Sequence, residues 1–403
     1  MNFGIRPSGD IRAVRLSDIP PHDILCAGSP CQPFSKAGDQ QGLDCPKWGD
    51  LFGYVLRILK HHRPNYVILE NVPNLQRHDD GETWAFLEKG LRRHGYDVRV
   101  SSLSPHRYGI PQIRERLFVV ASLGKLDKFV WPQPLSGRDL SVHRVLDKNP
   151  RDARSLSGQY LDCLSAWQDF LSAFPRNAEL PSFPIWSMEF GATYPYEGTT
   201  PYAVGSRALS RYRGSHGARL GDLEPSERMS GLPSYAQTRE KSFPKWKARF
   251  IAQNREFYAQ HKAMIDRWLP GILSFPASLQ KFEWNCKGAQ RDIWKFLIQF
   301  RASGVRIKRP TTAPSLVAMT TTQVPIIGWE RRYMTARECS RLQSLDALIH
   351  LPSTPRRAYR ALGNAVNADL VRLVAAALVP TGKAKRVKPV GGAVRQFSSN
   401  ASA

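Results

Sequence analysis

The chain has 403 residues, enough for two domains, and carries 58 Lys and Arg against 34 Asp and Glu. The formal charge of +24 favours a polyanionic partner, above all nucleic acid. The amino-terminal residues lack the apolar core of a signal peptide, and no run of 18 apolar residues follows, so we expect a cytoplasmic protein without a membrane span. The six cysteines, at 26, 31, 45, 163, 286 and 339, have no zinc-ligand spacing, which predicts reduced thiols and no metal site.

The first chemical feature along the chain is a cysteine in a stiff loop. Residues 23–27 (Asp-Ile-Leu-Cys-Ala) indicate a short buried strand that Gly28 ends. Cys31 follows between Pro30 and Pro33, and proline restricts both its own backbone and that of the residue before it. A rigid thiol at the carboxyl end of a strand suits a nucleophile. For this residue taken alone, a buried structural cysteine is the alternative interpretation.

The next hundred residues alternate between helix and strand patterns. Apolar spacing predicts helices around 51–59 and 84–91 and strands at 66–69, 98–100 and 117–120. This order indicates a mostly parallel sheet with helices on both faces, in which ligands gather beyond the carboxyl ends of the strands. Glu70 follows one such strand, as Cys31 follows another. Arg114 and Arg116 precede an apolar strand, and their alternation with Glu115 predicts that both arginines share one face.

The pattern fails from about residue 132, where Pro, Gly, Ser and aromatic residues dominate. We expect a catalytic domain at 1–135, a second domain at 136–325 whose strands the sequence does not define, a return to the first domain at 326–380, and a basic disordered tail at 381–403. Helical patterns return at 335–343 and 368–379. Basic and aromatic residues interleave at 207–213 and 245–250, as in surfaces that contact phosphates and stack on bases.

Six short motifs, in this order, resemble those of the DNA (cytosine-5) methyltransferases. They are Asp10-Ile11, the Ser-Pro-Cys-Gln-Pro-Phe-Ser loop around Cys31, Glu70-Asn71-Val72, Gln112-Ile113-Arg114-Glu115-Arg116, Thr335-Ala336-Arg337-Glu338 with Arg341-Leu342-Gln343, and Gly363-Asn364-Ala365-Val366-Asn367. The resemblance covers 10–122 and 331–379. It implies an α/β fold, with a Rossmann-like S-adenosylmethionine-dependent methyltransferase sheet and a second, irregular target-recognition domain. It also implies a nucleoid-associated enzyme of restriction–modification that acts on double-stranded DNA.

The resemblance assigns the chemistry to four residues. Cys31 would add to C6 of a cytosine flipped out of the duplex, since C5 is a poor nucleophile until something adds there, and a thiolate both adds and leaves readily. Glu70 is implied as the acid at N3, Arg116 as the contact to O2, and Arg114 as a neighbour of the nucleophile and a phosphate. Residues 32–47 would form a mobile loop that closes over the base.

The resemblance also implicates seven residues in binding S-adenosylmethionine: Asp10, Ile11, Pro30, Leu51, Asn364, Ala365 and Val366. The glycine-rich loop with which the family begins, and the acidic residue that grips the ribose, are not found before Asp10. We therefore expect a sheet that lacks its first strands. A misplaced start, a split enzyme completed by a missing amino-terminal fragment or companion chain, and decay remain open as explanations.

Three functions compete at this point. The first is a DNA cytosine-5 methyltransferase, and the second is a non-catalytic DNA-binding remnant or one half of a split enzyme. The third is a cysteine hydrolase based on Cys31, which needs a histidine base. His61, His62, His78, His94 and His106 form no recognisable pattern for that role.

Overall fold

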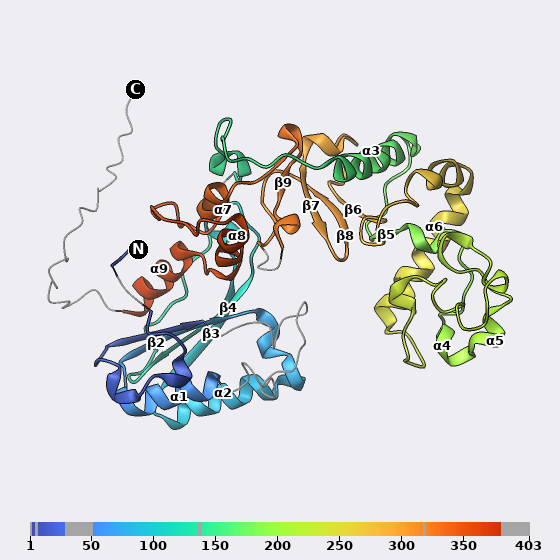
Figure 1. Cartoon of the computed structure of the whole chain (residues 1–403). Helices are drawn as coiled ribbons and strands as arrows, with labels where there is room; N and C mark the ends of the chain where they lie inside the picture. The colour runs from blue at the N-terminus through green and yellow to red at the C-terminus, as the bar shows by residue number, and fades with distance from the viewer. Residues whose placement is uncertain (1, 5–6, 29–50, 136–138, 317–319, 380–403) are drawn as a thin grey trace. The chain divides into compact units, whose positions relative to one another are not determined.

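A computed structural model describes residues 2–4, 7–28, 51–135, 139–316 and 320–379 (Figure 1). The described chain forms two compact units, each built from separated segments. The four-stranded unit comprises residues 8–103, 116–133 and 369 onward, and the six-stranded unit comprises residues up to 7, 104–115 and 134–368. This grouping puts 326–368 with the middle of the chain rather than with its start, because strands in that range complete the six-stranded sheet.

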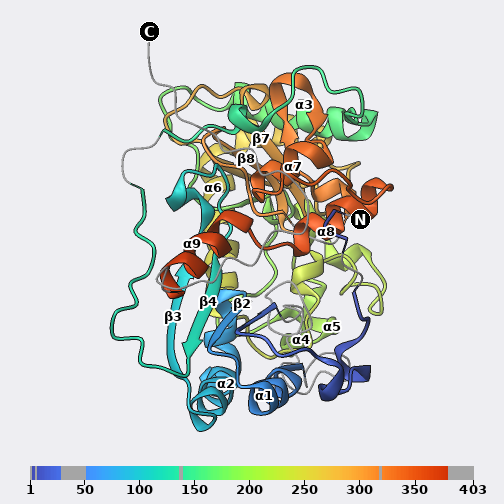
Figure 2. The ribbon, with the colours of Figure 1, turned by 90° about the vertical axis from the view of Figure 1, so that its left-hand side faces the viewer.

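The four-stranded unit has the expected alternation of strands and helices. Its elements are β1 (Ile24–Gly28), α1 (Leu51–His62), β2 (Tyr66–Asn71), α2 (Glu82–Arg93), β3 (Asp97–Leu103), β4 (Arg116–Ser122) and α9 (Ala368–Leu378). The strand order is β1-β2-β4-β3, with β1 parallel to β2. The helices α1 and α2 lie side by side on one face of the sheet, and α9 lies on the other (Figures 1 and 2).

One strand departs from the expected parallel arrangement. β4 runs antiparallel to both of its neighbours, β2 and β3. A parallel connection needs a long crossover, usually a helix. Between β3 and β4 the chain forms only a short 3-10 turn, Pro105–Tyr108, so it returns in the opposite direction. The alternation predicted for Arg114 and Arg116 therefore does not apply to Arg114, since β4 begins at Arg116.

Alternating side chains of the sheet supply two apolar layers. Val67 and Leu69 of β2 pack with Leu59 of α1 and Leu87 of α2 in one core. Ile68 points to the opposite face, together with the fully buried Phe118 and Val120 of β4. At the free edge of the described sheet, β1 is exposed at alternate positions, and Ile24 keeps 39% of its surface.

The six-stranded unit holds the strands that the sequence did not define. Its sheet has the order β10-β9-β7-β8-β6-β5. Its strands are β5 (Ile185–Trp186), β6 (Lys281–Asn285), β7 (Leu297–Arg301), β8 (Gly304–Lys308), β9 (Ile326–Ile327) and β10 (Arg332–Tyr333). Its helices are α3 (Gly158–Ala173), α4 (Pro201–Val204), α5 (Ser206–Leu209), α6 (Lys245–Trp268), α7 (Ala336–Leu342) and α8 (Pro355–Asn364).

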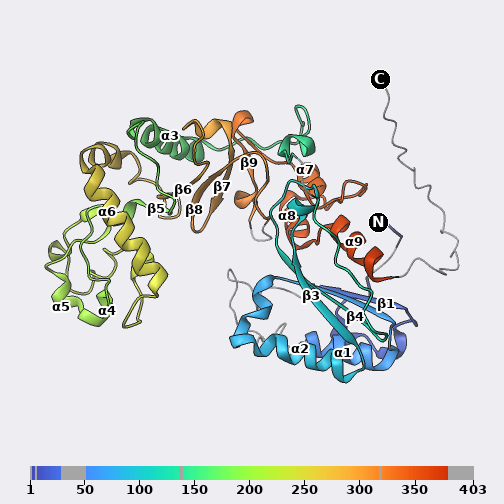
Figure 3. The same ribbon diagram turned by 180° about the vertical axis from the view of Figure 1, so that it is seen from behind.

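Aromatic side chains hold the core of this unit together. Trp167 of α3 stacks on Phe282 of β6 with 4.7 Å between ring centroids, and its indole nitrogen donates to the carbonyl of Leu279 over 2.9 Å. Trp268, at the end of α6, lies 4.8 Å from Trp167 and donates to the carbonyl of Ala166. The core thus joins α3, α6 and β6, which are far apart in the sequence (Figure 3).

One stretch of the described chain, Pro355–Leu378, has the length and apolar composition of a membrane-spanning helix. The structure divides this stretch into α8 and α9 at residues 365–367. Leu362 of α8 and Leu370, Val374 and Leu378 of α9 are buried in the protein. Core helices of globular proteins pass the same test of length and composition.

We predict that Leu59→Ala lowers the free energy of unfolding of the four-stranded unit by about 2–5 kcal/mol, because Leu59 is fully buried and its loss leaves a cavity. Phe86→Ala on α2 is the matched control, since Phe86 is 49% exposed, and it should change the same quantity by less than about 0.5 kcal/mol. Urea titrations of the two variants measure both. Equal effects would contradict the assigned core.

Candidate active site

Glu70 and Arg116 meet at the end of the four-stranded sheet. Glu70 lies directly opposite Phe118 on the neighbouring strand, and Arg116 lies two residues before Phe118. The two charged side chains therefore sit diagonally on one face, the face away from α1 and α2. Nε of Arg116 is 3.0 Å from a carboxylate oxygen of Glu70, and the side chains are only 17% and 15% exposed. A half-enclosed ion pair thus marks the carboxyl end of β2.

The same carboxylate lies beside the end of β1. Gly28 is the register partner of Glu70, and a Cβ at Gly28 would stand 3.5 Å from the second carboxylate oxygen. Gly28 is the last described residue before the loop that contains Pro30 and Cys31, and both of these lie outside the described residues. The proposed mobile loop at 32–47 lies outside them as well.

The four described cysteines are poor candidates for a nucleophile. Cys163, Cys286 and Cys339 are buried, and burial raises the pKa of each thiol, to about 12 for Cys163 and Cys286. Cys26 is exposed on β1, and partial desolvation raises its pKa too. A nucleophilic cysteine needs a thiolate at neutral pH, which a raised pKa disfavours. Within the described chain, none of these thiols competes with Cys31 for that role.

Arg114 is buried in the six-stranded unit, with 3% of its surface exposed. Its backbone nitrogen donates to the hydroxyl of Ser104. Its guanidinium donates to four oxygens: the Leu316 carbonyl at 2.8 Å, the Ser315 hydroxyl at 3.2 Å, the Gly363 carbonyl at 2.6 Å and the Ala365 carbonyl at 2.9 Å. Arg114 thereby satisfies carbonyls at the carboxyl end of α8, where a helix leaves its last carbonyls without partners.

The Gly-Asn loop at 363–367 is also fixed by the preceding motif. The buried Asn367 donates to the carbonyl of Leu342 at 3.1 Å, and the amide of Gln343 donates to the carbonyl of Leu362 at 3.2 Å. Backbone bonding continues the link, since Ala368 donates to the carbonyl of Gln343 at 2.9 Å. Three of the sequence motifs, at 112–116, 341–343 and 363–367, are therefore joined by hydrogen bonds.

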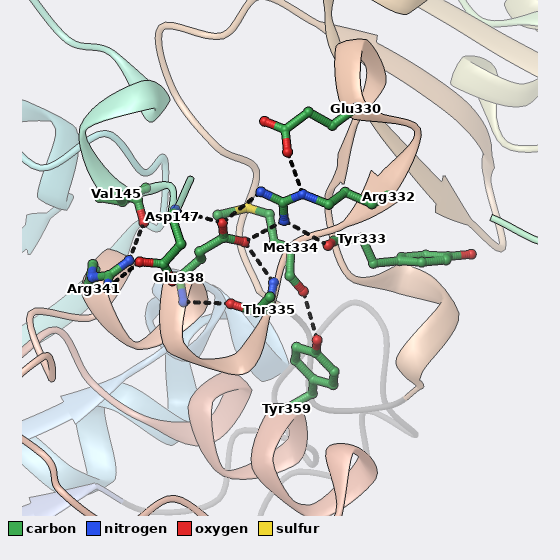
Figure 4. Close-up of polar contacts among 10 residues, drawn as sticks. All are labelled: Val145, Asp147, Glu330, Arg332, Tyr333, Met334, Thr335, Glu338, Arg341 and Tyr359. Atoms are coloured by element: carbon green, nitrogen blue, oxygen red, sulfur yellow. Dashed lines mark hydrogen bonds and ion pairs between the residues drawn. The ribbon is translucent and has the colours of Figure 1, made fainter. Parts of the chain in front are cut away.

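A buried ion pair holds the start of α7 (Figure 4). Arg332 makes two parallel bonds of 2.9 Å to the carboxylate of Glu338, which is fully buried. Glu338 and Thr335 also form a capping box. The Thr335 backbone nitrogen donates to the Glu338 carboxylate, and the Glu338 backbone nitrogen donates to the Thr335 hydroxyl.

Two neighbours extend this cluster (Figure 4). The backbone of Asp147 donates to Glu338 over 2.9 Å, and Arg341 is 2.7 Å from the Asp147 carboxylate. On the other side, Tyr359 of α8 donates to the carbonyl of Met334 over 2.7 Å. The motif at 335–343 is thus a structural tie between α7, α8 and the segment around 147, rather than a set of exposed catalytic groups.

The remaining residues expected at a methyl-donor site are divided between the units. Asp10, Ile11 and Leu51 lie in the four-stranded unit, where Leu51 begins α1 and Asp10 caps a 3-10 turn, Ile11–Ala13. Hydrogen bonds from Arg12 hold the pKa of the Asp10 carboxyl at about 2, below its usual value. Asn364, Ala365 and Val366 lie in the six-stranded unit, with Asn364 exposed and the other two half-buried.

Sequence reasoning missed two residues that organise this region. Ser104 holds the backbone of Arg114 and accepts or donates at a ring nitrogen of His106, 2.9 Å away. Arg332 supplies the counter-charge to Glu338. No sequence pattern points to Ser104. Arg332 could have been found, because it lies three residues before Thr335 and a basic residue there can pair with Glu338 of the same motif. Among the described residues, no group of three or more His, Cys, Asp or Glu is placed to hold a metal ion.

Comparisons with known proteins agree with these motifs. The family model described as C-5 cytosine-specific DNA methylase matches residues 1–169. Type II methyltransferase M.NlaX of Neisseria lactamica is 33% identical over 232 residues, which cover 57% of this chain and 71% of that protein. M.AluI of Cellulosimicrobium cellulans is 29% identical over 87% of this chain and 78% of its own length. M.MspI of Moraxella sp is 44% identical, but over 33% of this chain and 32% of its own length.

We predict that Glu338→Gln lowers the free energy of unfolding of the six-stranded unit by about 3–5 kcal/mol, because it removes the fully buried counter-charge of Arg332 and leaves only the partly exposed Glu330. Glu179→Gln is the control, since it removes an exposed ion pair with Lys287 of the same unit and should cost less than about 1 kcal/mol. Thermal or urea unfolding of the two variants measures the difference. A loss for Glu338→Gln no larger than that of the control would contradict the assigned tie.

Proposed function

The chain belongs to the C-5 cytosine-specific DNA methylase family and is a methyltransferase, and we propose that it methylates C5 of a cytosine flipped out of duplex DNA. The observation that carries this proposal is the Glu70–Arg116 pair beside Gly28. It puts an acid and a cation at the strand end from which the Cys31 loop departs. Those are the groups that an addition to a pyrimidine ring requires.

In the proposed reaction the Cys31 thiolate forms a bond to C6 of the base. The electron pair of the C5–C6 double bond moves to C5, and the ring gains negative charge that hydrogen bonds at N3 and O2 stabilise. C5 would then form a bond to the methyl carbon of a sulfonium donor, while the methyl–sulfur bond breaks and its electron pair stays on sulfur as a neutral thioether. A base removes the C5 proton, and the electron pair of that C–H bond re-forms the double bond as Cys31 leaves. The thiol is regenerated, so Cys31 acts as a nucleophilic catalyst.

In this proposal Glu70 and Arg116 contact different atoms of the base. Arg116 has donors for O2, and Glu70 faces N3. In the structure these two side chains are paired with each other, so the base must compete for them. We infer that the incoming base takes donors of Arg116 for itself, which weakens its hold on Glu70. Arg114 holds the backbone at residues 363 and 365, within the loop that contributes to the proposed donor set.

The methyl donor is proposed to be S-adenosylmethionine, which supplies an electrophilic methyl group. Asp10 fits an adenine amino group because its carboxylate is exposed and stays ionised, although Arg12 already donates to both oxygens. Ile11 and Leu51, both half-buried, offer apolar surface. Pro30, Asn364, Ala365 and Val366 complete the proposed set.

The DNA partner is proposed to contact the basic surface of the chain, with residues 136–325 as the target-recognition region. A charge of +24 favours phosphate contacts, and such binding weakens as salt rises. The named relatives are type II methyltransferases, which supports a role in restriction–modification. We propose that the chain acts in the cytoplasm, on nucleoid DNA.

The exposed edge of β1 supports a further part of this proposal. An edge strand presents unpaired backbone groups that another strand can bind. β1 is apolar, yet exposed at alternate positions, and it pairs only with β2 in the part of the sheet that the structure describes. We propose that a glycine-rich fragment or companion chain pairs with this edge and completes the donor site. If nothing supplies that strand, a DNA-binding remnant is the second candidate function.

We expect the wild-type chain to transfer label from methyl-labelled S-adenosylmethionine to cytosine in DNA, alone or after addition of a polypeptide with a strand followed by Phe-x-Gly-x-Gly. Cys31→Ser should lower this transfer at least about a thousand-fold, because a hydroxyl does not replace the thiolate. Cys26→Ser is the control and should retain activity. Transfer by Cys31→Ser at the wild-type rate would exclude the mechanism, and no transfer under either condition would favour the remnant.

Glu70→Gln keeps the size of the side chain but removes its proton-transfer capacity. We expect methyl transfer to fall by about 10²–10⁴-fold, with DNA affinity within a few-fold of wild type. Glu115→Gln changes the exposed residue between Arg114 and Arg116 in the same motif, and it should leave both quantities unchanged. Single-turnover rates and DNA titrations separate the two effects. Parallel loss of affinity and rate would instead indicate a structural role for Glu70.

A further inference from the structure

A cavity of about 360 Å³ opens between α6 and the polar face of the six-stranded sheet. Asn254 of α6 fixes this arrangement, since its side-chain oxygen accepts from the backbone of Trp186 on β5 over 2.7 Å. Figure 3 shows α6 passing beside β5. Trp186 and Lys281 are register partners across β5 and β6, and Glu283 lies on the same face of β6 as Lys281. The cavity is therefore built on regular elements of one unit.

Aromatic rings form one wall of this cavity. Trp246 and Phe250 lie one turn apart on α6, with ring centroids 6.0 Å apart and planes at 71°. Phe250 meets Trp186 in a similar edge contact, at 5.5 Å and 73°. Trp246 lines the cavity and is 52% exposed, so much of this large aromatic residue is open to solvent. This is the segment, 245–250, in which basic and aromatic residues interleave.

Two lysines lie against the same wall. Lys281 stands 4.8 Å from the ring centroid of Tyr235 and 5.6 Å from that of Trp186. Lys247 donates to the carbonyl of Tyr235 over 3.0 Å. Desolvation lowers the pKa of both lysines, and the charge of Lys247 lowers that of Lys281 further. In the part of the chain that the structure describes, neither lysine has a carboxylate within ion-pair distance.

Arginines line the floor. Arg306 makes two bonds of 2.9 Å to the carboxylate of Glu283, and Arg301 pairs with the same carboxylate. Nε of Arg301 is buried and donates to no acceptor among the described residues. The Glu283 carboxylate thus pairs with both arginines, while Lys281 and the nearby Lys247 have no carboxylate partner among the described residues. The cavity combines open ring faces, uncompensated positive charge and an unused donor.

We propose that this cavity binds one unpaired nucleotide of the DNA, with its base against Trp246 and its phosphate beside Lys281. This inference rests on the proposed DNA-binding function. It describes a second nucleotide site, built on α6 and β6 and separate from the Glu70–Arg116 pair of the other unit.

The chemistry of the wall selects an unpaired nucleotide over paired DNA. In a duplex each base has both faces covered by its neighbours, so a ring wall has nothing to stack on. An extruded nucleotide presents a free face and a phosphate together, which match the exposed side chain of Trp246 and the ammonium group of Lys281. A free mononucleotide has the same chemistry and is distinguished by the experiment.

The test compares a fully paired duplex, the same duplex with one extra unpaired nucleotide, and free deoxynucleoside monophosphates. Binding is followed by anisotropy for the duplexes and by tryptophan fluorescence for the nucleotides. Wild type should prefer the duplex with the unpaired nucleotide. Trp246→Ala should weaken that complex by about 5- to 150-fold and change affinity for the paired duplex less than about two-fold. Lys281→Gln should lower the salt dependence of the same complex by about one charge.

Tyr202→Ala is the matched control, because Tyr202 is an aromatic side chain of the same unit with 51% of its surface exposed. It should leave both affinities unchanged. Equal loss on both duplexes for Trp246→Ala, no loss on either, or free nucleotides bound as tightly as the bulged duplex would overturn the inference. A wild type that binds the paired duplex without preference overturns this site alone, whereas one that binds neither duplex overturns the proposed DNA-binding function as well.

Discussion

The buried guanidinium of Arg114 is the contact on which the arrangement of the motifs depends. The guanidinium donates to residues 315, 316, 363 and 365, while the backbone nitrogen of Arg114 donates to Ser104. The segment at 104–114 is thereby fixed to segments much later in the chain. A buried arginine is stable only when its donors are satisfied, and here four oxygens accept from it. Because those oxygens come from two separate segments, either segment alone leaves the charge unsatisfied. The buried Arg114 side chain is therefore stable only when the segments at 315–316 and 363–365 are both in place.

The sequence predicted the α/β class and most elements of the four-stranded unit, because their apolar spacing is regular. β1, α1, β2, α2 and β4 all form close to the expected residues. The comparisons confirm the family that the motifs suggested. The antiparallel direction of β4 was not predicted, since direction depends on a short turn at 105–108 and not on the periodicity of the strand itself. The strands of the six-stranded sheet were not predicted either, because they are short and come from distant segments.

The candidate site was predictable in its residue types but not in their pairing. Glu70 and Arg116 were chosen from motifs 46 residues apart, and only the register of β2 against β4 makes them diagonal neighbours. Arg114 and Arg116 look equivalent in sequence, yet one is buried under carbonyls and the other faces a carboxylate. The difference arises because β4 begins between them, which turns the chain from irregular backbone into a sheet. Local sequence carries no signal for that boundary.

The interleaving of the two units has a consequence for biosynthesis. α9 packs on a sheet whose described strands all precede residue 123, and most of the six-stranded unit, residues 134–368, is synthesised in between. Ile68, Phe118 and Val120 lie on the face opposite α1 and α2. That face is covered by α9 only after α9 has been synthesised. During translation the nascent sheet therefore keeps apolar surface in water for some 250 residues of synthesis, a state in which chaperone binding and aggregation compete with folding.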